Sequence, residues 1–305
     1  MAVPREAGKD EQGPAMPNPA ARTAVGPMTI VAAAQWGPQE HRIHEDKLAY
    51  GFLPAATRAI VSLTRWEPAR RALFNATESR AKGLWAEMLC RKRYVDDKLR
   101  AAVTAGVDNV VILGAGLDTL AYRRPVPAGT AVFEVDQPDT ISYKKKAVTR
   151  ALGKMPATVT LVPIDFQKEN LREVLTAHGY RSGGRTFFVW EAVTQYLTED
   201  AVRSCFTFLS QASAGSELVF TYVRKDFLDG ITLYGAEGAY LDFVMKNRLW
   251  QFGMNPDQVE GFLADYSWMV KEQLGGKEFT ARYVAPSGSR LPVTDIEQSC
   301  YAVKS

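Results

Sequence analysis

Two glycines that follow a short apolar run are the first residues in this sequence that could take part in ligand chemistry. The run at residues 109–113 leads directly into Gly114 and Gly116. Glycines at the end of a strand allow a sharp turn and a close approach of the backbone to a ligand. This spacing predicts a nucleotide-type turn, although a glycine turn after a strand is also a common structural device.

Acidic residues lie about 20 positions after this turn, at the end of the next apolar run. Glu134 and Asp136 alternate with Val135, so both carboxylates are expected on the same side of their strand. A carboxylate at such a strand end can accept hydrogen bonds from ribose hydroxyls. Asp136 lies further along and is the predicted ribose ligand. The alternative is a helix N-cap acid before Pro138.

The residue at position 119 distinguishes two kinds of cofactor. A dinucleotide fingerprint has a third glycine there, which lets a pyrophosphate sit at the helix terminus, whereas this chain has Thr119. S-Adenosylmethionine has a ribose and an amino-acid tail but no pyrophosphate. Two glycines and a strand-end acid therefore favour S-adenosylmethionine over NAD. An NAD-type oxidoreductase and a cofactor-binding protein without activity are the alternatives.

A scaffold of alternating strands and helices must position these residues. Apolar runs predict strands at 109–113, 131–135, 160–164, 186–190, 217–223, 268–274 and 297–303. Helical patterns lie between them, including one at 140–152 in which lysines 144–146 are expected to face solvent. The alternation predicts an α/β fold with a doubly wound, mostly parallel sheet and a ligand site at the carboxyl ends of its strands.

The rest of the chain divides into a tail, a helical lead-in and an insertion. Residues 1–27 are predicted to be a flexible tail before a single domain at 28–305. The lead-in at 28–105 ends in a long amphipathic helix. A helical cap insertion is predicted at about 224–255. Its apolar and aromatic side chains would suit a greasy or aromatic acceptor or form an ordinary helical core, and they are Tyr234, Tyr240, Phe243, Met245 and Trp250.

Composition argues against several classes of protein. The net charge of +3 provides no field that would gather nucleic acid. No run reaches the ~18 uncharged apolar residues that cross a bilayer. Three scattered cysteines (Cys90, Cys205 and Cys300) suit neither a disulfide framework nor a metal site. We therefore expect a cytoplasmic protein without a metal. His41 and His44 could face a substrate, but in a polar stretch we expect them to be solvated. His178 is expected to end a surface helix.

Five segments, in order, resemble the leucine carboxyl methyltransferase family, which includes bacterial O-methyltransferases that act on small molecules. They are residues 90–97, 113–119, 133–138, 163–166 and 190–197. Gln137 and residues 39–42 depart from the family's commonest pattern. The resemblance implies a class I methyltransferase-like fold with a seven-stranded sheet. It also implies S-adenosylmethionine as cofactor and methyl transfer to a carboxylate or hydroxyl of a small-molecule acceptor.

The resemblance further implies roles for individual residues. Arg91 would pair with the cofactor carboxylate through a bidentate fork, and its position beside the apolar stripe of the helix permits this, whereas Arg93 would face solvent. Glu191 would hold the cofactor ammonium group. Tyr196 would lie over the methyl-transfer site as the catalytic candidate, or would be an ordinary core aromatic.

The adenine end of the cofactor would be held by Asp165 and Phe166, with Asp165 accepting from the amino group and Phe166 against the base. A turn and helix cap is the alternative for Asp165. The full set of cofactor-binding candidates is Arg91, Gly114, Ala115, Gly116, Asp118, Glu134, Asp136, Asp165, Phe166 and Glu191.

Overall fold

The computed structural model describes residues 23–124, 126–166 and 168–305. Most of the tail predicted at residues 1–27 therefore lies outside the described residues. Helix α2 (Val25–Ala34) begins within that range, so the predicted end of the tail is wrong. The helix forms because Met28, Ile30 and Val31 pack into the core and remove apolar surface from water.

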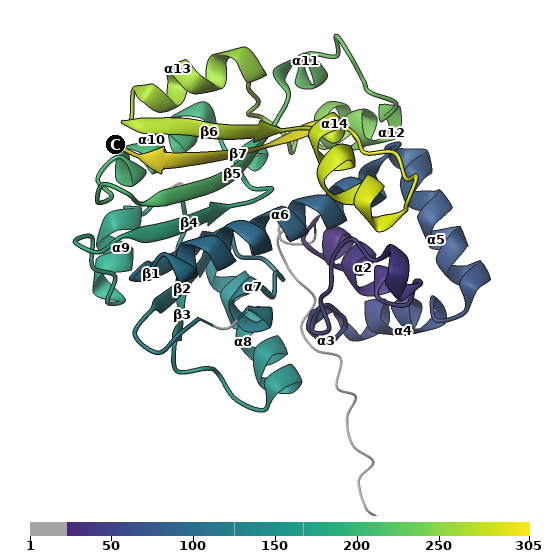
Figure 1. Cartoon of the computed structure of the whole chain (residues 1–305), viewed down its shortest axis with the longest axis horizontal. Helices are drawn as coiled ribbons and strands as arrows, with labels where there is room; N and C mark the ends of the chain where they lie inside the picture. The colour runs from purple at the N-terminus through teal and green to yellow at the C-terminus, as the bar shows by residue number, and fades with distance from the viewer. Residues whose placement is uncertain (1–22, 125, 167) are drawn as a thin grey trace, which may run out of the picture.

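A seven-stranded sheet forms the centre of the described part of the chain (Figure 1), in the order β3-β2-β1-β4-β5-β7-β6. The strands are β1 (Asn109–Leu113), β2 (Ala131–Asp136), β3 (Val159–Pro163), β4 (Thr186–Trp190), β5 (Glu217–Val223), β6 (Trp268–Leu274) and β7 (Glu297–Lys304). Strands β1 to β5 run parallel, and β7 lies antiparallel between β5 and β6. The predicted doubly wound, mostly parallel sheet is confirmed.

Helices cover both faces of this sheet. One face packs against α2, α3 (Ala49–Phe52), α6 (Leu84–Thr104), α7 (Leu120–Arg123) and α8 (Pro138–Leu152). The other packs against α9 (Leu171–Ala177), α10 (Glu199–Leu209) and α13 (Val259–Ala264). A hydrophobic core lies on each face of the sheet, and alternate residues of β1 point into one or the other. Val110 and Ile112 belong to the core on the α6 face, and Val111 and Leu113 belong to the core on the α10 face. None of the helices in the described ranges is both long and apolar enough to cross a membrane.

Shorter helices complete the lead-in and the cap. The lead-in also contains the 3-10 turn η1 (Gln39–His41), α4 (Ala55–Leu63) and α5 (Glu67–Arg80). The predicted insertion holds α11 (Lys225–Leu228), α12 (Glu237–Ala239) and the π-helical segment η3 (Tyr240–Lys246). Another 3-10 turn, η2 (Thr194–Tyr196), follows β4, and α14 (Gly276–Phe279) follows β6.

The cap is held together by its own aromatic core. Phe243 stacks on Trp250 with ring centroids 4.8 Å apart, and Tyr240 packs against Phe227 at 5.6 Å. Met245 is exposed. These contacts match the helical-core alternative for the aromatic residues of the insertion.

Several charged residues of α6 are buried, although the helix is amphipathic. Lys92 and Asp96 are buried along with Arg91, whereas Arg93 and Asp97 are partly exposed and pair at 3.1 Å. These side chains are buried because α6 is enclosed by the sheet, α2, α5 and α14. Buried charges of this kind must be paired, and each of these is.

The expected solvent exposure of residues 144–146 is wrong at Lys144. Lys145 and Lys146 are exposed, but the Lys144 side chain is fully buried. Its Nζ lies 2.5 Å from Glu134 Oε1 and donates to the Ala115 carbonyl oxygen at 3.0 Å. The ion pair therefore joins α8, β2 and the loop after β1 inside the core.

Replacing Lys144 should test this pair directly. We expect Lys144→Ala to lower the free energy of unfolding by about 3–5 kcal/mol, because Glu134 would be left as an uncompensated buried charge. Lys145→Ala, which removes the adjacent exposed ammonium group, should leave that free energy nearly unchanged. Urea denaturation followed by circular dichroism measures both, and equal effects of the two substitutions would contradict the structural role of the pair.

Candidate functional site

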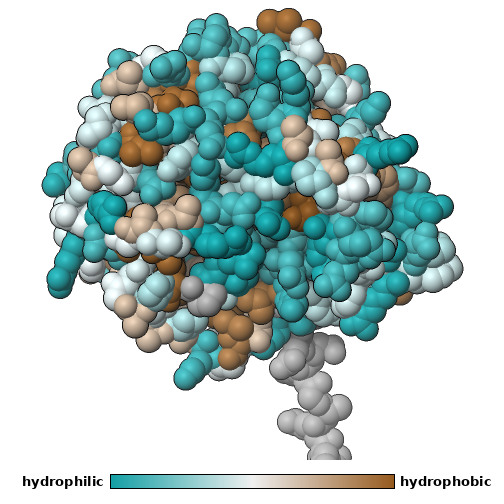
Figure 2. Space-filling model, in the orientation of Figure 1, coloured by the Kyte–Doolittle hydropathy of each residue, from teal (hydrophilic) through white to brown (hydrophobic). Residues whose placement is uncertain are grey.

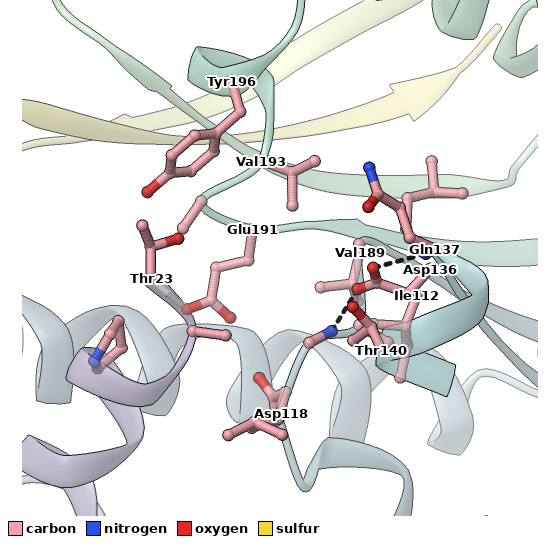
Figure 3. Close-up of a pocket in the computed structure, with 18 of the residues that line it drawn as sticks. Thr23, Ile112, Asp118, Asp136, Gln137, Thr140, Val189, Glu191, Val193 and Tyr196 are labelled. Atoms are coloured by element: carbon pink, nitrogen blue, oxygen red, sulfur yellow. Dashed lines mark hydrogen bonds between the residues drawn. The ribbon is translucent and has the colours of Figure 1, made fainter. Parts of the chain in front are cut away.

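A cavity of about 640 Å³ opens at the carboxyl ends of β1, β2 and β4. Strand β1 pairs with β2 on one side and β4 on the other, so the chain leaves β1 and β4 in different directions. Such a switch point leaves a crevice between the outgoing loops. Figure 3 shows part of its lining, including Thr23 before α2 and side chains of the loops after β1, β2 and β4. Helix α6 contributes Arg91 and Lys92 to the same lining.

The glycine turn forms one wall of this cavity. Gly114 and Gly116 have positive φ values of 68° and 45°. A Cβ atom at Gly114 would lie 2.2 Å from Val193 Cγ2, so Val193 occupies the space that a side chain would need. The Gly114 and Ala115 amides both donate to the Val135 carbonyl oxygen, at 2.8 and 3.0 Å. The turn therefore brings its backbone close to the cavity, as the sequence predicts.

Asp136 lies at the end of β2 with its carboxylate at the cavity wall. Its Oδ2 accepts from the Gly116 amide at 2.7 Å, and its Oδ1 accepts from the Gln137 amide at 2.7 Å (Figure 3). Burial raises the pKa of Asp136, and these two hydrogen bonds oppose the rise. The N-cap position of α8 is Gln137, so Asp136 does not cap that helix. Each oxygen keeps lone-pair capacity for a ligand hydroxyl.

Arg91 lies on α6 at the opposite wall and is enclosed by carboxylates. Its Nε donates to Glu191 Oε1 at 2.8 Å, and its Nη1 donates to Glu297 Oε2 at 2.6 Å and Glu87 Oε1 at 3.1 Å. Burial opposes the charge on Arg91, but the surrounding carboxylates outweigh it and raise its pKa. Among the described residues, Met88 Sδ is the one hydrogen-bond acceptor of Nη2, at 3.0 Å. A ligand carboxylate could take both nitrogens of the Nε–Nη2 edge only by displacing Glu191.

Glu191 bridges the two cations of α6. One carboxylate accepts from Arg91 Nε at 2.8 Å and from Lys92 Nζ at 3.1 Å. Lys92 also pairs with Asp118, which Arg123 contacts in turn. Burial would raise the pKa of Asp118, but Arg123 and Lys92 lower it well below its ordinary value. Asp118 thus reaches the cavity wall while also anchoring the loop, because its Oδ1 accepts from the Leu120 amide at 2.7 Å.

Asp165 and Phe166 follow β3 and line the far end of the cavity. Asp165 also belongs to a turn, since its carbonyl oxygen accepts from the Lys168 and Glu169 amides at 3.0 and 2.9 Å. Its carboxylate pairs with exposed Lys168 at 2.9 Å. Asp165 therefore lines the cavity, as the resemblance implies, and also belongs to a turn, as the alternative predicts.

Tyr196 ends η2 and lines the cavity, with its hydroxyl directed toward Thr23 (Figure 3). Burial raises the pKa of Tyr196, although Thr23 and Trp250 oppose the rise. The phenol therefore stays protonated near neutral pH and can donate a hydrogen bond. Because its side chain lines the cavity, Tyr196 is not solely a core aromatic.

Glu134 is the one predicted site residue that the structure does not bring to the cavity. It is fully buried behind the glycine turn, paired with Lys144 and hydrogen-bonded to Tyr122. Strand alternation places Glu134 and Asp136 on the same side of β2, but the glycine turn covers Glu134. Glu134 supports the turn from behind and is not positioned to contact a ligand in the cavity.

Several cavity residues have no distinct signal in the sequence. Lys92 follows Arg91 on a helix with several charged residues, and nothing in the local pattern marks it as a cavity residue. Thr23 falls within the predicted tail. Leu249 and Gln251 are contributed by the cap, whereas the five side chains singled out in that insertion do not line the cavity. The Gln251 amide donates to the Gln195 carbonyl oxygen at 2.6 Å, which joins the cap to η2.

The three histidines are not among the residues that line this cavity. His178 is exposed at the end of α9 and His41 is exposed, as expected. His44 is buried, so the expectation that it is solvated is wrong.

Alanine at Gly114 should distinguish the cost of packing against Val193 from the cost of a positive φ at this turn. We expect Gly114→Ala to destabilise the protein by about 2–4 kcal/mol, because it adds a clash with Val193 to the cost of a positive φ. Gly153→Ala is the matched control, since Gly153 has a φ of 80° but nothing within 4 Å of an added Cβ. Urea denaturation of both variants measures the difference. A Gly114→Ala effect no larger than that of Gly153→Ala would contradict close packing of the turn on Val193.

Comparison with known proteins agrees with the geometry of the fold. A model of the leucine carboxyl methyltransferase family matches residues 24–210. A protein of Mycobacterium avium, named by inference as an S-adenosyl-L-methionine-dependent methyltransferase, is 35% identical over 166 residues, which cover 54% of this chain and 53% of the relative. The chain therefore spans about half the length of this relative. A Frankia alni protein with the same kind of name is 28% identical over 294 residues, covering 95% and 94% of the two chains.

A solved structure from Thermobifida fusca YX, assigned by inference as a methyltransferase, has a similar fold. It superposes with a TM-score of 0.55 at 16% sequence identity, covering 88% of this chain and 98% of the other. At this identity the likeness shows the fold alone, and it agrees with the predicted class I methyltransferase-like sheet. The family match, in contrast, covers more than half of the sequence and includes both walls of the cavity. This chain belongs to the leucine carboxyl methyltransferase family.

Proposed function

We propose that this chain is an S-adenosylmethionine-dependent methyltransferase that methylates a carboxylate or hydroxyl oxygen of a small-molecule acceptor. The observation that carries the proposal is the carboxylate of Asp136, which the Gly116 amide orients at the wall of a cavity at the sheet's switch point. Family membership and the names of the relatives support the same activity.

The charges that line the cavity fit a ligand with a positive centre. Of the described residues that line it, four are acidic (Asp118, Asp136, Asp165 and Glu191) and two are basic (Arg91 and Lys92), an excess of two acids over bases. S-Adenosylmethionine carries a sulfonium and an ammonium group, and both would be favoured by this excess. When bound, it supplies an electrophilic methyl group. Asp136 would hold its ribose, and Asp165 and Phe166 its adenine.

The amino-acid end of the ligand would meet the Arg91–Glu191 pair. Glu191 is suited to the ammonium group, and Arg91 to the carboxylate. Because the two side chains pair with each other at 2.8 Å, that contact must loosen for both roles to be fulfilled. Lys92 keeps a carboxylate partner in Asp118 if Glu191 moves toward a ligand.

An NAD-type site is less compatible with the region around Thr119. The Thr119 side chain is buried, and its Oγ1 donates to Asp46 Oδ2 at 2.6 Å. Helix α7, which follows the turn, has only four residues. A pyrophosphate needs the free amides of a regular helix N-terminus close to the turn. Neither the position nor the length of α7 offers such a site.

The residues of the chain would act on the acceptor by orienting it and excluding water. Tyr196 can donate a hydrogen bond to an acceptor oxygen, while Leu249 and Gln251 of the cap enclose the same region. A carboxylate acceptor is already ionised near neutral pH, whereas a phenol of pKa ≈ 10 would need a base. A panel of both acceptor types, scored for a mass gain of about 14 daltons, tests the activity.

Replacing Asp136 should weaken cofactor binding without unfolding the protein. We expect Asp136→Ala to reduce S-adenosylmethionine affinity by about 1.5–3 kcal/mol, because the ribose would lose a charge-assisted hydrogen bond. Asp139→Ala removes an exposed acid three residues away and should leave affinity unchanged. Titration calorimetry with S-adenosylmethionine, and with NAD as the competing candidate, measures this. Unchanged affinity in a folded Asp136→Ala variant, or preferential NAD binding, would contradict the proposal.

Lysine at position 91 should test the guanidinium fork. We expect Arg91→Lys to weaken S-adenosylmethionine binding, because lysine keeps the charge but cannot offer two parallel donors. Arg93→Lys, two residues away on the partly exposed side of α6, should have little effect. Thermal unfolding in the same samples reports whether Arg91→Lys retains the fold. A larger binding loss from Arg93→Lys would show that the role belongs to that residue instead.

Removal of one hydroxyl should separate orientation of the acceptor from cofactor binding. We expect Tyr196→Phe to slow single-turnover methyl transfer roughly tenfold to a hundredfold, about 1–3 kcal/mol, while cofactor affinity stays nearly constant. The reason is that the hydroxyl would position the nucleophilic oxygen. Rate and affinity measured on one preparation decide the matter, and an unchanged rate would remove Tyr196 from the reaction.

A further inference from the structure

A second cavity, of about 340 Å³, lies between the end of α2, helices α5 and α6, and residues 288–291. It shares no lining residue with the cavity at the switch point. Its size falls at the lower end of the range for small-molecule sites. The methyltransferase function assigned to the first cavity makes no use of it.

The interior of the second cavity is apolar. Ile43, Trp85 and Leu89 are buried, and Phe74 and Leu291 are partly buried beside them. Two aromatic and three aliphatic side chains from four separate segments therefore converge on one space. Such a lining favours an apolar ligand body, because transfer from water gains about 25 cal/mol per Å² of apolar surface.

Basic side chains gather at the rim of the same cavity. Arg71 pairs at 2.9 Å with Glu67, the only acid among the described residues that line this cavity. Arg42 and Arg70 have no carboxylate partner among the described residues. Arg42 Nη2 donates to the Gln35 carbonyl oxygen at 2.9 Å, and Arg70 Nη1 donates to the Thr64 carbonyl oxygen at 3.2 Å. Arg42 Nε is buried without a hydrogen-bond acceptor in the part of the chain that the structure describes.

A buried imidazole in the wall also lacks partners. The His44 side chain is fully buried, and neither ring nitrogen has a hydrogen bond with any described residue. The closest carboxylate oxygen, Asp96 Oδ2, is 3.7 Å from Nδ1, beyond hydrogen-bond distance. Burial lowers the pKa of His44 well below its ordinary value, and Arg123 and Lys92 lower it further. The ring is therefore neutral and offers one donor and one acceptor.

We propose that the second cavity is a binding site for an organic carboxylate with an apolar body. The body would lie against Trp85, Phe74 and Leu89, and the carboxylate would accept hydrogen bonds from Arg42 and Arg70. Two guanidinium groups without acidic partners at the mouth of an apolar space match this amphipathic anion better than a neutral or cationic molecule. Figure 2 shows a mostly hydrophilic surface over α5, the helix that contributes Glu67, Arg70 and Arg71 to the lining.

Titration calorimetry with sodium decanoate, below its micellar concentration, tests the site. Decan-1-ol has the same chain without the charge, and inorganic phosphate has charge without the chain. We expect decanoate to bind saturably and each of the other two to bind at least about tenfold more weakly. The double variant Arg42→Gln/Arg70→Gln should lose roughly tenfold or more of the decanoate affinity while decanol binding stays constant.

Controls separate this site from a general charge effect and from the first cavity. Arg172→Gln removes one exposed guanidinium group from α9 and should not change decanoate binding. Thermal unfolding verifies that the variants are folded, and Arg70→Gln alone replaces the double variant if that one unfolds. Crystals soaked in ω-bromodecanoate should place the bromine, by anomalous scattering, near Trp85 and Phe74. Absence of saturable decanoate binding, insensitivity to the arginine substitutions, or bromine only in the first cavity would each overturn the proposal.

Discussion

The buried ion pair between Lys144 and Glu134 is the contact on which the geometry of the first cavity depends. It joins α8 to β2 at 2.5 Å, and the same ammonium group donates to the carbonyl oxygen of Ala115 in the glycine turn. Both side chains are fully buried, so neither can exchange its partner for water without a large cost. The turn is thus held from behind by a charge pair and from the side by Val193. Asp136 and Gly116 keep their mutual position within that frame.

The wall of the first cavity that α6 forms contains several buried charges, which must be paired. Helix α6 is enclosed on several sides, yet it carries Arg91, Lys92 and Asp96 into the interior. Burial raises the pKa of Glu87 to about 8, although Arg91 opposes this shift. This wall therefore holds its charges in a network of alternating sign, in which Arg91 contacts three carboxylates and Lys92 contacts two. A rigid apolar wall could not recognise both ends of an amino acid.

The two cavities lie on either side of one set of lead-in elements. The start of α2 borders the first cavity and its last residue, Ala34, borders the second. Helix α6 does the same, with Arg91 and Lys92 facing one and Trp85 and Leu89 facing the other. Between them, His44 lies 3.7 Å from Asp96, which pairs with Arg123, and Arg123 contacts Asp118 in the first cavity. The lead-in is therefore part of the binding architecture as well as a cover for the sheet.

Hydrophobic periodicity in the sequence determined the sheet almost residue by residue. The predicted strands at 109–113, 186–190 and 217–223 have the observed bounds, because strands buried on both faces must be nearly continuous apolar runs. The edge strand at 268–274 also has the predicted bounds, although most of its residues are only partly buried or exposed. The glycine turn and Asp136 were also predictable, since their function depends on local backbone geometry at a strand end. Only the tertiary structure decided which charges are buried. Arg91 meets Glu191 and Glu297 across 100 and 206 residues of chain, and Lys144 is buried while Lys145 is exposed. The sequence around a charged residue does not reveal whether that residue lies in solvent or in the core. In the core the charge is stable only when a distant segment brings its counter-charge into contact.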